Sequence, residues 1–268
     1  MKLEVMEYLP NIPVKTAPLL FIHGAYHGAW CWKEHFLPYF STRGFPSYAL
    51  SYRGHGASDG RKELNSFSLE DYTEDVLQTM ELLPDKPVLV GHSLGGAVAQ
   101  KILYSYPDKL KAVVLLASVS PNGMLQDFLR LYISNIRDVV RMHLFNDSRT
   151  KVNFIVNHFF PRDLPAGKRD NYVKLLQPES SRVRRDYLRK IITGLPKSRV
   201  PLLVIGSEND PVISQKTTAG IGRYYGVEPV IFPDISHDMM LDPRWKTVAC
   251  RIFSFLNDLH LTKEREKP

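Results

Sequence analysis

Short apolar runs alternate with longer segments of helical periodicity over the first 120 residues. The strand-like runs cover residues 3–9, 18–22, 45–51, 87–92 and 110–117. The segments whose apolar positions share one side of a helix cover residues 31–43, 68–83 and 94–106. Continuous apolar runs are typical of strands covered on both faces, and apolar positions three or four residues apart are typical of helices that pack on them. The alternation predicts right-handed βαβ units in an open, mostly parallel sheet.

The alternation stops after residue 117. Only helical patterns follow, at residues 125–141, 151–159, 167–176 and 182–193. Strand-like runs return at residues 201–206 and 228–232, and a closing helix is predicted at residues 245–259. We therefore expect an α/β protein in which residues 1–120 and 200–268 form the core. Residues 121–199 are expected to form an inserted helical cap.

The composition is that of an ordinary globular protein, with 44% hydrophobic and 24% charged residues among 268. The first ten residues lack the pattern of a signal peptide, and no run approaches the ~18 apolar residues that span a bilayer. Cys31 and Cys250 are too few for a disulfide framework, and neither has the spacing of a metal ligand. We expect a cytoplasmic protein with free thiols, no metal and no cofactor.

The positive charge is concentrated in the predicted cap. Residues 121–199 contain 16 Lys and Arg against 7 Asp and Glu, whereas the rest of the chain contains 19 against 21. One interpretation is a solvated helical face, and the other is attraction of an anionic substrate, carrier or membrane surface. No nucleic-acid-binding motif accompanies the charge, so a nucleic-acid partner is not expected.

A Gly-x-Ser-x-Gly motif from Gly91 to Gly95 lies between a predicted strand and a predicted helix. In this context the serine stands at the tip of a sharp turn, where a Cβ at either glycine would clash. The pattern predicts that Ser93 is a catalytic nucleophile. The alternative is a glycine-rich strand-to-helix loop that contains an incidental serine.

A serine hydroxyl needs a base, an orienting acid and hydrogen-bond donors for the oxyanion. Enzymes with this turn place the acid and then the histidine later in the chain, after further strands. Asp210 follows the strand-like run at 201–206 and is the predicted acid, with Glu208 as its rival and a simple turn as the other interpretation. His237 follows the last predicted strand and is the predicted base.

Backbone amides are expected to form the oxyanion hole, namely those of Leu94 and of Ala25 in the loop after residue 22. His23 in this loop is expected to brace it by hydrogen bonds. Tyr26 and Trp30 of the loop, with Phe128 and Tyr132 of the predicted cap, are candidate substrate contacts. The alternative for such aromatic residues is packing within the cap itself.

Nearly the whole chain resembles the α/β-hydrolase superfamily. The resemblance rests on His23-Gly24, Arg53-Gly-His-Gly-x-Ser58, the Gly-His-Ser-Leu-Gly-Gly turn, Asp210-Pro-Val and the late His237. Residues 23–30 also resemble the plant methylesterase and hydroxynitrile-lyase group. The lyases of that group carry Thr at the Gly24 position and Lys after the base, where this chain has Asp238, so the resemblance favours the hydrolases. The large insertion is similar to that of bacterial lipase-like and lysophospholipase-like members.

The favoured function is a serine hydrolase that cleaves a small-molecule carboxylic ester through an acyl-enzyme on Ser93. An acyltransferase or thioesterase with the same Ser-Asp-His triad is an alternative, and a non-catalytic ligand receptor of the same fold is another. Dehalogenase and epoxide-hydrolase chemistry is not expected, because those enzymes carry Asp where this chain has Ser93.

Overall fold

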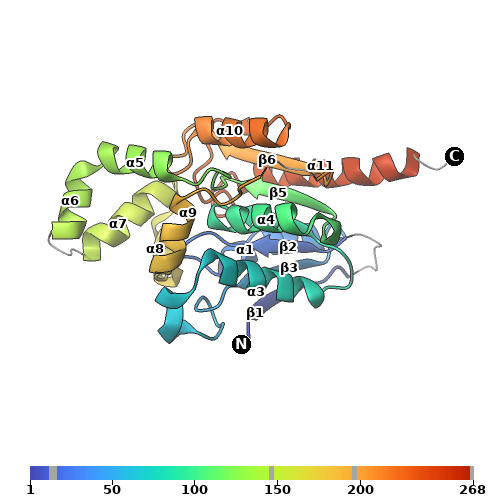
Figure 1. Cartoon of the computed structure of the whole chain (residues 1–268), viewed down its shortest axis with the longest axis horizontal. Coiled ribbons are helices and arrows are strands. Elements are labelled where there is room, and N and C mark those ends of the chain that lie inside the picture. The colour runs from blue at the N-terminus through green and yellow to red at the C-terminus, as the bar shows by residue number, and fades with distance from the viewer. Residues whose placement is uncertain (12–16, 145–147, 195–197, 266–268) are drawn as a thin grey trace.

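Seven strands form one sheet in the part of the chain that this computed structural model describes, residues 1–11, 17–144, 148–194 and 198–265. Their order across the sheet is β1-β3-β2-β4-β5-β6-β7; Figure 1 labels β1, β3, β2, β5 and β6 in this order from bottom to top. The strands are β1 (Glu4–Tyr8), β2 (Leu19–Ile22), β3 (Ser47–Ser51), β4 (Val88–His92), β5 (Ala112–Leu116), β6 (Leu202–Ser207) and β7 (Val230–Phe232). β1 pairs antiparallel with β3 at one edge, and the other strand pairs are parallel. The mostly parallel sheet predicted from the sequence is confirmed.

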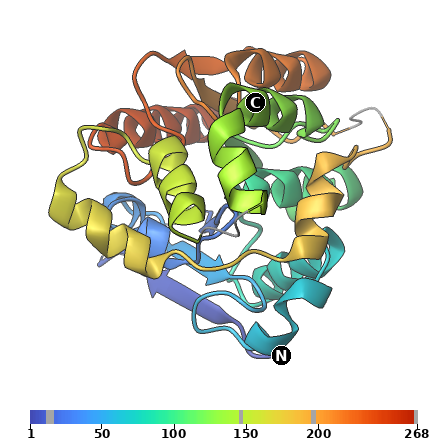
Figure 2. The same ribbon diagram turned by 90° about the vertical axis from the view of Figure 1, so that its left-hand side faces the viewer.

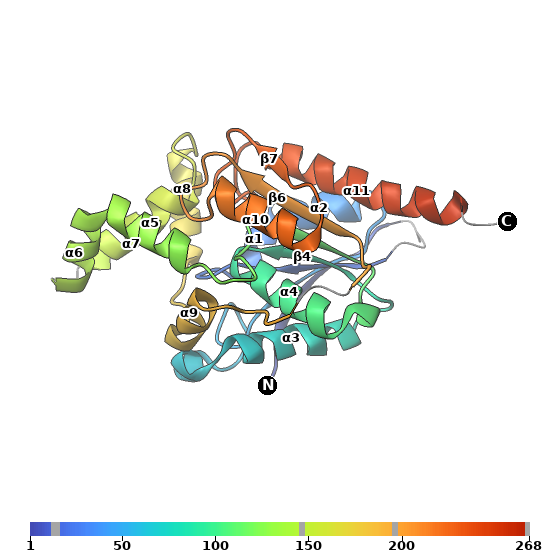
Figure 3. The same cartoon turned by 45° about the horizontal axis from the view of Figure 1, so that its top comes forward.

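Helices cover both faces of the sheet (Figure 3). Those of the core are α1 (Trp30–Lys33), α2 (Phe36–Ser41), α3 (Leu69–Glu81), α4 (Leu94–Ser105), α10 (Gln215–Tyr225) and α11 (Trp245–Arg265), with 3-10 turns η1 (Arg61–Ser66) and η2 (Pro107–Lys109). Residues of α1, α2 and α11 pack on one face, and residues of α3, α4 and α10 pack on the other. The continuous apolar runs of the strands follow from this double coverage.

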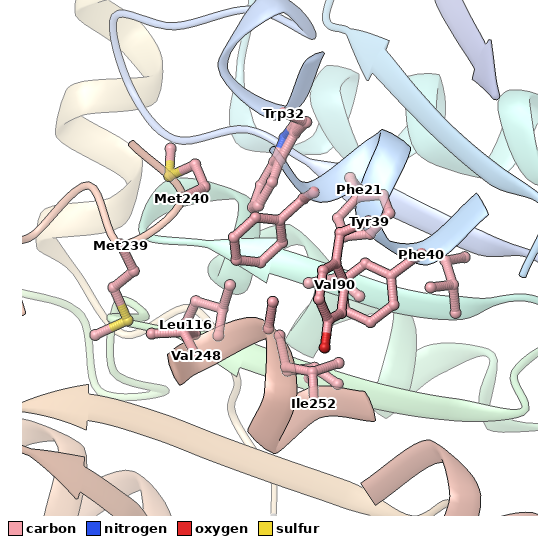
Figure 4. Close-up of a cluster of buried hydrophobic side chains, with 14 of the residues drawn as sticks. Phe21, Trp32, Tyr39, Phe40, Val90, Leu116, Met239, Met240, Val248 and Ile252 are labelled. Carbon is pink, nitrogen blue, oxygen red and sulfur yellow. The ribbon is translucent and has the colours of Figure 1, made fainter. Parts of the chain in front are cut away.

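Successive residues of a strand belong to two separate hydrophobic cores, one on each face of the sheet. Phe21 of β2 and Val90 of β4 pack with Trp32, Phe40 and Ile252 on the face shown in Figure 4. Their chain neighbours, such as Leu20 and Leu89, belong to the core on the opposite face. Successive side chains of a strand point to opposite faces of the sheet. Because both faces are covered, a strand between the two cores needs apolar residues at successive positions.

Two of the predicted helices are interrupted in the structure, and one helix was not predicted. The helix expected at residues 31–43 is divided into α1 and α2, because Pro38 lacks the N–H that would bond to the Glu34 carbonyl. The helix expected at 125–141 is divided at Asn135, whose side-chain amide donates to the Leu131 carbonyl at 2.8 Å. α10 was not predicted. The helix predicted at 68–83 is confirmed as α3, with a capping box between Ser68 and Asp71.

Five helices separate β5 from β6 in the described part of the chain. They are α5 (Leu125–Ser134), α6 (Ile136–Leu144), α7 (Ser148–Phe159), α8 (Ala166–Leu175) and α9 (Ser181–Leu188). α9 ends five residues before the predicted boundary at residue 193. We call this group the inserted helices; Figure 2 shows them together on one side of the molecule. They share a cavity with the loops after β2, β4, β5 and β6, so they lie over the carboxyl ends of the parallel strands.

The passage from β4 to α4 depends on close contact between backbones. A Cβ on Gly95 would lie 2.2 Å from the carbonyl oxygen of Ile22 and 2.7 Å from that of His23. A Cβ on Gly91 would lie 2.5 Å from the carbonyl oxygen of Gly95. Any side chain at these positions would push α4 away from the centre of the sheet.

We therefore expect Gly95→Ala to lower the free energy of unfolding by at least about 2 kcal/mol, since the new methyl group meets rigid backbone. Gly167→Ala is the matched control, because a Cβ at that position of α8 meets nothing within 4 Å. The control should leave stability unchanged or raise it by up to about 1 kcal/mol. Urea denaturation measures both changes. Equal denaturation midpoints for the two variants would contradict this account of the turn.

Candidate active site

Ser93 stands at the tip of the turn between β4 and α4. Its φ of 51° and ψ of −113° place a non-glycine residue in a sparsely populated backbone conformation. Its own N–H donates to the Leu116 carbonyl at 2.9 Å, which ties the turn to β5. The side chain is largely buried but lines a cavity beneath the inserted helices. The strained turn therefore places Ser93 on the wall of that cavity.

Asp210 and His237 form a buried hydrogen-bonded pair. Nδ1–H of His237 donates to Oδ2 of Asp210 at 2.8 Å. The other oxygen of Asp210 accepts from the backbone amides of Val212 and Ile213 at 2.7 and 3.0 Å. The rival residue Glu208 is exposed to solvent. The carboxylate therefore fixes the imidazole so that Nε2 remains for chemistry.

The pKa of His237 reflects two opposing effects. Burial favours the neutral ring and lowers its pKa, but the charge and hydrogen bond of Asp210 outweigh burial, so the pKa is raised above its usual value. A neighbouring carboxylate that stabilises the imidazolium is the arrangement that a general base needs.

His92, the residue before Ser93, holds the loop of His237 by a hydrogen bond. Its Nε2–H donates to the carbonyl oxygen of His237 at 2.9 Å, and the two rings lie 4.9 Å apart. Burial lowers the pKa of His92 to about 3, so this ring is neutral. Among the described residues no hydrogen bond yet joins the Ser93 hydroxyl to His237. Such bonds are often long in ligand-free enzymes and tighten when substrate binds.

Ala25 and Leu94, whose amides are the predicted oxyanion hole, lie at the cavity beside Ser93. Ala25 and Leu94 both line the cavity, and neither N–H donates a hydrogen bond to any residue in the described ranges. Backbone amides seldom lack an acceptor. A pair of them beside a nucleophile can stabilise the negative oxygen of a tetrahedral intermediate.

His27 links the loop of Ala25 to the loop of His237. Its Nδ1–H donates to the Ala25 carbonyl at 2.8 Å, and its Nε2 lies 3.0 Å from Oδ2 of Asp238. Both side chains are fully buried. Burial raises the pKa of Asp238, but the charge and hydrogen bond of His27 outweigh it and lower the pKa below its usual value. We call His27 and Asp238 the loop clamp; sequence reasoning missed it, because its partners are 211 residues apart.

The inserted segment holds the same loop from the other side. The backbone N–H of Gln177 donates to the Tyr26 carbonyl at 3.0 Å, and its side-chain amide donates to the His27 carbonyl at 2.9 Å. The Gln177 carbonyl Oε1 accepts from Arg61 at 2.8 Å and from the Gly56 amide at 3.2 Å. We call residues 23–29 the oxyanion loop, after the role predicted for the Ala25 amide. One glutamine therefore connects the inserted segment to the oxyanion loop and to a core loop.

The cavity above Ser93 has a volume of about 450 Å³. Of the candidate substrate contacts, Tyr26, Phe128 and Tyr132 line it. Trp30 is not among the lining residues; its ring packs 5.2 Å from that of His27 and 6.2 Å from that of Tyr172. Arg184 lines the cavity but was missed, because nothing in the sequence separates it from the other arginines of α9.

One group of side chains in the described residues has the spacing of a metal site. Donor atoms of His92, His237 and Asp238 lie within 4.8 Å of one another. Nε2 of His92 already donates to a carbonyl, Nδ1 of His237 to Asp210, and one oxygen of Asp238 bonds to His27. These hydrogen bonds account for the proximity of the three side chains.

Comparison with known proteins shows the family of the chain. The family model described as "Alpha/beta hydrolase family" matches residues 19–249. Methylesterase 2 of Arabidopsis thaliana is 34% identical over 105 residues, which is 38% of this chain and 40% of that protein. Salicylic acid-binding protein 2 of Nicotiana tabacum is 36% identical over 107 residues, 39% of this chain and 40% of that protein. The matched part of the chain thus spans about two fifths of the length of these relatives.

Structural comparison supports the fold. The esterase EaEST from Exiguobacterium antarcticum matches 95% of each chain with a TM-score of 0.75 and 18% sequence identity. The resemblance to plant methylesterases stated from residues 23–30 is confirmed by the curated relatives. Within the described residues, no helix combines the length and the apolar character needed to cross a bilayer.

The loop clamp should stabilise the protein in a pH-dependent way. Asp238→Asn removes the buried partner of His27 and should lower the free energy of unfolding by about 3 kcal/mol at pH 7. The lowered pKa of Asp238 means that its contribution is present above about pH 4, the pKa of an unfolded Asp, and is lost as the pH falls through the folded value. The difference between wild type and variant should therefore shrink below pH 4.

Urea denaturation between pH 3 and 7 measures this difference. Asp170→Asn is the matched control, since Asp170 is an exposed carboxylate on α8. A destabilisation by Asp238→Asn that stays constant over the whole pH range would show that the clamp acts by packing rather than by charge.

Proposed function

Because the chain belongs to the alpha/beta hydrolase family, we propose that it cleaves a carboxylic ester through an acyl-enzyme on Ser93. The observation that carries the proposal is the buried His237–Asp210 hydrogen bond beside a nucleophile turn that opens into a cavity. In this proposal residues 1–120 and 200–268 are the catalytic core. Residues 121–199 are a helical cap that encloses the substrate.

The first half of the reaction acylates the serine. Oγ of Ser93 attacks the ester carbonyl carbon while Nε2 of His237 accepts the hydroxyl proton. Asp210 keeps the ring in the tautomer with Nδ1 protonated and stabilises the imidazolium that forms. The carbonyl oxygen becomes an oxyanion, which the amides of Ala25 and Leu94 stabilise. The C–O bond to the alcohol then breaks, and the departing alkoxide takes the proton from His237.

The second half of the reaction releases the acid. Water gives a proton to the neutral His237 and attacks the acyl carbon, forming a second oxyanion at the same two amides. The bond to Oγ breaks, and His237 returns the proton to Ser93. Each group has thus returned to its starting state.

The Gly24 position supports hydrolysis rather than lyase chemistry. A Cβ at Gly24 would lie 2.8 Å from Nδ1 of His92 and 3.1 Å from the Cβ of Ser93. A threonine there, as in the lyases of the methylesterase group, requires His92 to move. The names of the curated relatives, which include methylesterases, support an ester with a small alcohol as the substrate class.

Labelling with a fluorophosphonate tests the nucleophile. The wild-type protein should react at Ser93, and Ser93→Ala should not react and should lose at least about 10³-fold in kcat on p-nitrophenyl esters. Ser66→Ala, at an exposed serine, is the control and should react like wild type. Intact-mass spectrometry and esterase assays measure the two effects. A wild-type protein that is neither labelled nor active would favour the receptor interpretation.

The pH dependence of kcat/KM tests the base. His237 must be neutral to accept the proton, and Asp210 raises its pKa, so activity should rise with pH along a limb whose midpoint lies above about 6.5. Asp210→Asn removes the charge that raises the pKa and the acceptor that fixes the tautomer. It should move the midpoint down and reduce kcat by about 10³- to 10⁴-fold. A midpoint that Asp210→Asn leaves in place would contradict these roles.

A further inference from the structure

The cavity above Ser93 contains one charge among otherwise uncharged lining residues. Aliphatic and aromatic side chains form most of its wall, including Met124, Phe128, Leu131 and Phe159. Among the described residues that line the cavity, Arg184 of α9 is the one that carries a charge. Arg184 is half-buried, and a guanidinium that is partly withdrawn from water favours an anion or several acceptors as partners.

Three tyrosines surround this charge. Tyr26, Tyr132 and Tyr187 all line the same cavity, and the proximity of Tyr26 first, then of Tyr187 and Tyr132, raises the pKa of the Arg184 guanidinium. Tyr26 comes from the oxyanion loop, Tyr132 from α5 and Tyr187 from α9. Phenol groups can donate hydrogen bonds to an anion but do not neutralise an arginine. The cluster therefore offers several hydrogen-bond donors to an anion, and the buried carboxylate of Glu179, which acts on Tyr26 and Tyr187, lies 3.4 Å from Nε2 of His55.

The carboxylates near Arg184 in the sequence bond to other groups. Oδ2 of Asp186 accepts from the Leu69 amide at 3.0 Å. Oε1 of Glu179 accepts from the Tyr72 hydroxyl at 2.8 Å and from the Ser180 amide at 2.6 Å. In the described part of the chain no Asp or Glu forms an ion pair with Arg184. Arg184 thus lines the cavity without a carboxylate partner among the residues that the structure describes.

We propose that Arg184, with the surrounding tyrosines, binds an ionised carboxylate on the substrate, at the end remote from the ester that Ser93 attacks. The substrate class is then a monoester of a dicarboxylic acid. Arginine suits this role, because its planar fork binds both oxygens of a carboxylate. A cavity of about 450 Å³ accommodates a substrate of this size. The proposal rests on the proposed esterase function and names its specificity residue.

Hydrolysis of matched ester pairs tests the proposal. Monoethyl esters of the dicarboxylic acids from succinate to suberate are compared with ethyl alkanoates of the same chain length. For the best length, wild type should have at least about a tenfold higher kcat/KM on the anionic ester than on the neutral one. Arg184→Met should lower kcat/KM on the anionic ester by about 10- to 100-fold, mainly through KM. Its kcat/KM on the neutral ester should change less than about threefold.

Two further variants separate binding from structure. Arg184→Lys keeps the charge without the fork and should retain an intermediate preference for the anionic ester. Arg185→Met is the matched control, because Arg185 is the exposed neighbour on the same helix, and it should keep the wild-type preference. Equal losses on both esters in Arg184→Met would show that Arg184 only supports the fold, and would overturn the proposal.

A measurement on the wild-type protein does not depend on any variant folding. Adipate should slow labelling of Ser93 by a fluorophosphonate at concentrations where hexanoate does not, and added salt should weaken this protection. A protein that is labelled and cleaves neutral esters, but shows neither preference nor protection, would overturn the carboxylate site and leave the esterase function intact. A protein that is not labelled at all would instead overturn the esterase function.

Discussion

The contact between the backbone of Gly95 and the carbonyl of Ile22 determines the arrangement of the whole candidate site. It allows α4 to start directly against the end of β2, where a Cβ on Gly95 would lie 2.2 Å from the Ile22 oxygen. As a result, Leu94 at the start of α4 and Ala25 after β2 line the same cavity. The strained conformation of Ser93 is the cost of this approach, and the surrounding parallel strands hold it in place.

Of the buried histidines near this turn, His237 is the proposed catalytic base, and the others hold loops in place by hydrogen bonds. His23, His27 and His92 each donate a hydrogen bond to a backbone carbonyl, which fixes the tautomer and orients a loop. Burial lowers the pKa of His23 and of His92, so neither ring carries a charge near neutral pH. His237 differs from His23 and His92, because it donates to a carboxylate and its pKa is raised. His27 also has a carboxylate partner, Asp238, but both of its ring nitrogens form hydrogen bonds that hold loops together.

Most of the fold could be predicted from the sequence, whereas only part of the candidate site could. The strands were recognisable because double coverage forces continuous apolar runs, and Ser93, Asp210 and His237 because each follows a strand in a fixed order. The order of residues along the chain does not reveal the loop clamp, because His27 and Asp238 come together only in the folded protein. Arg184 could not be separated from Arg182 and Arg185, because only the packing of α9 decides which arginine faces the cavity.

The hydrogen bonds of Gln177 hold the oxyanion loop against the segment that contains the inserted helices. The glutamine fixes the carbonyls of Tyr26 and His27, the two residues that follow Ala25. An insertion in this fold is therefore not a freely exchangeable module. A recombined enzyme that acquired the helices of a relative without an equivalent of this glutamine would inherit a new pocket together with a less rigid oxyanion loop. In the proposed enzyme, one side chain thus connects the segment that lines the pocket to the loop that carries the Ala25 amide.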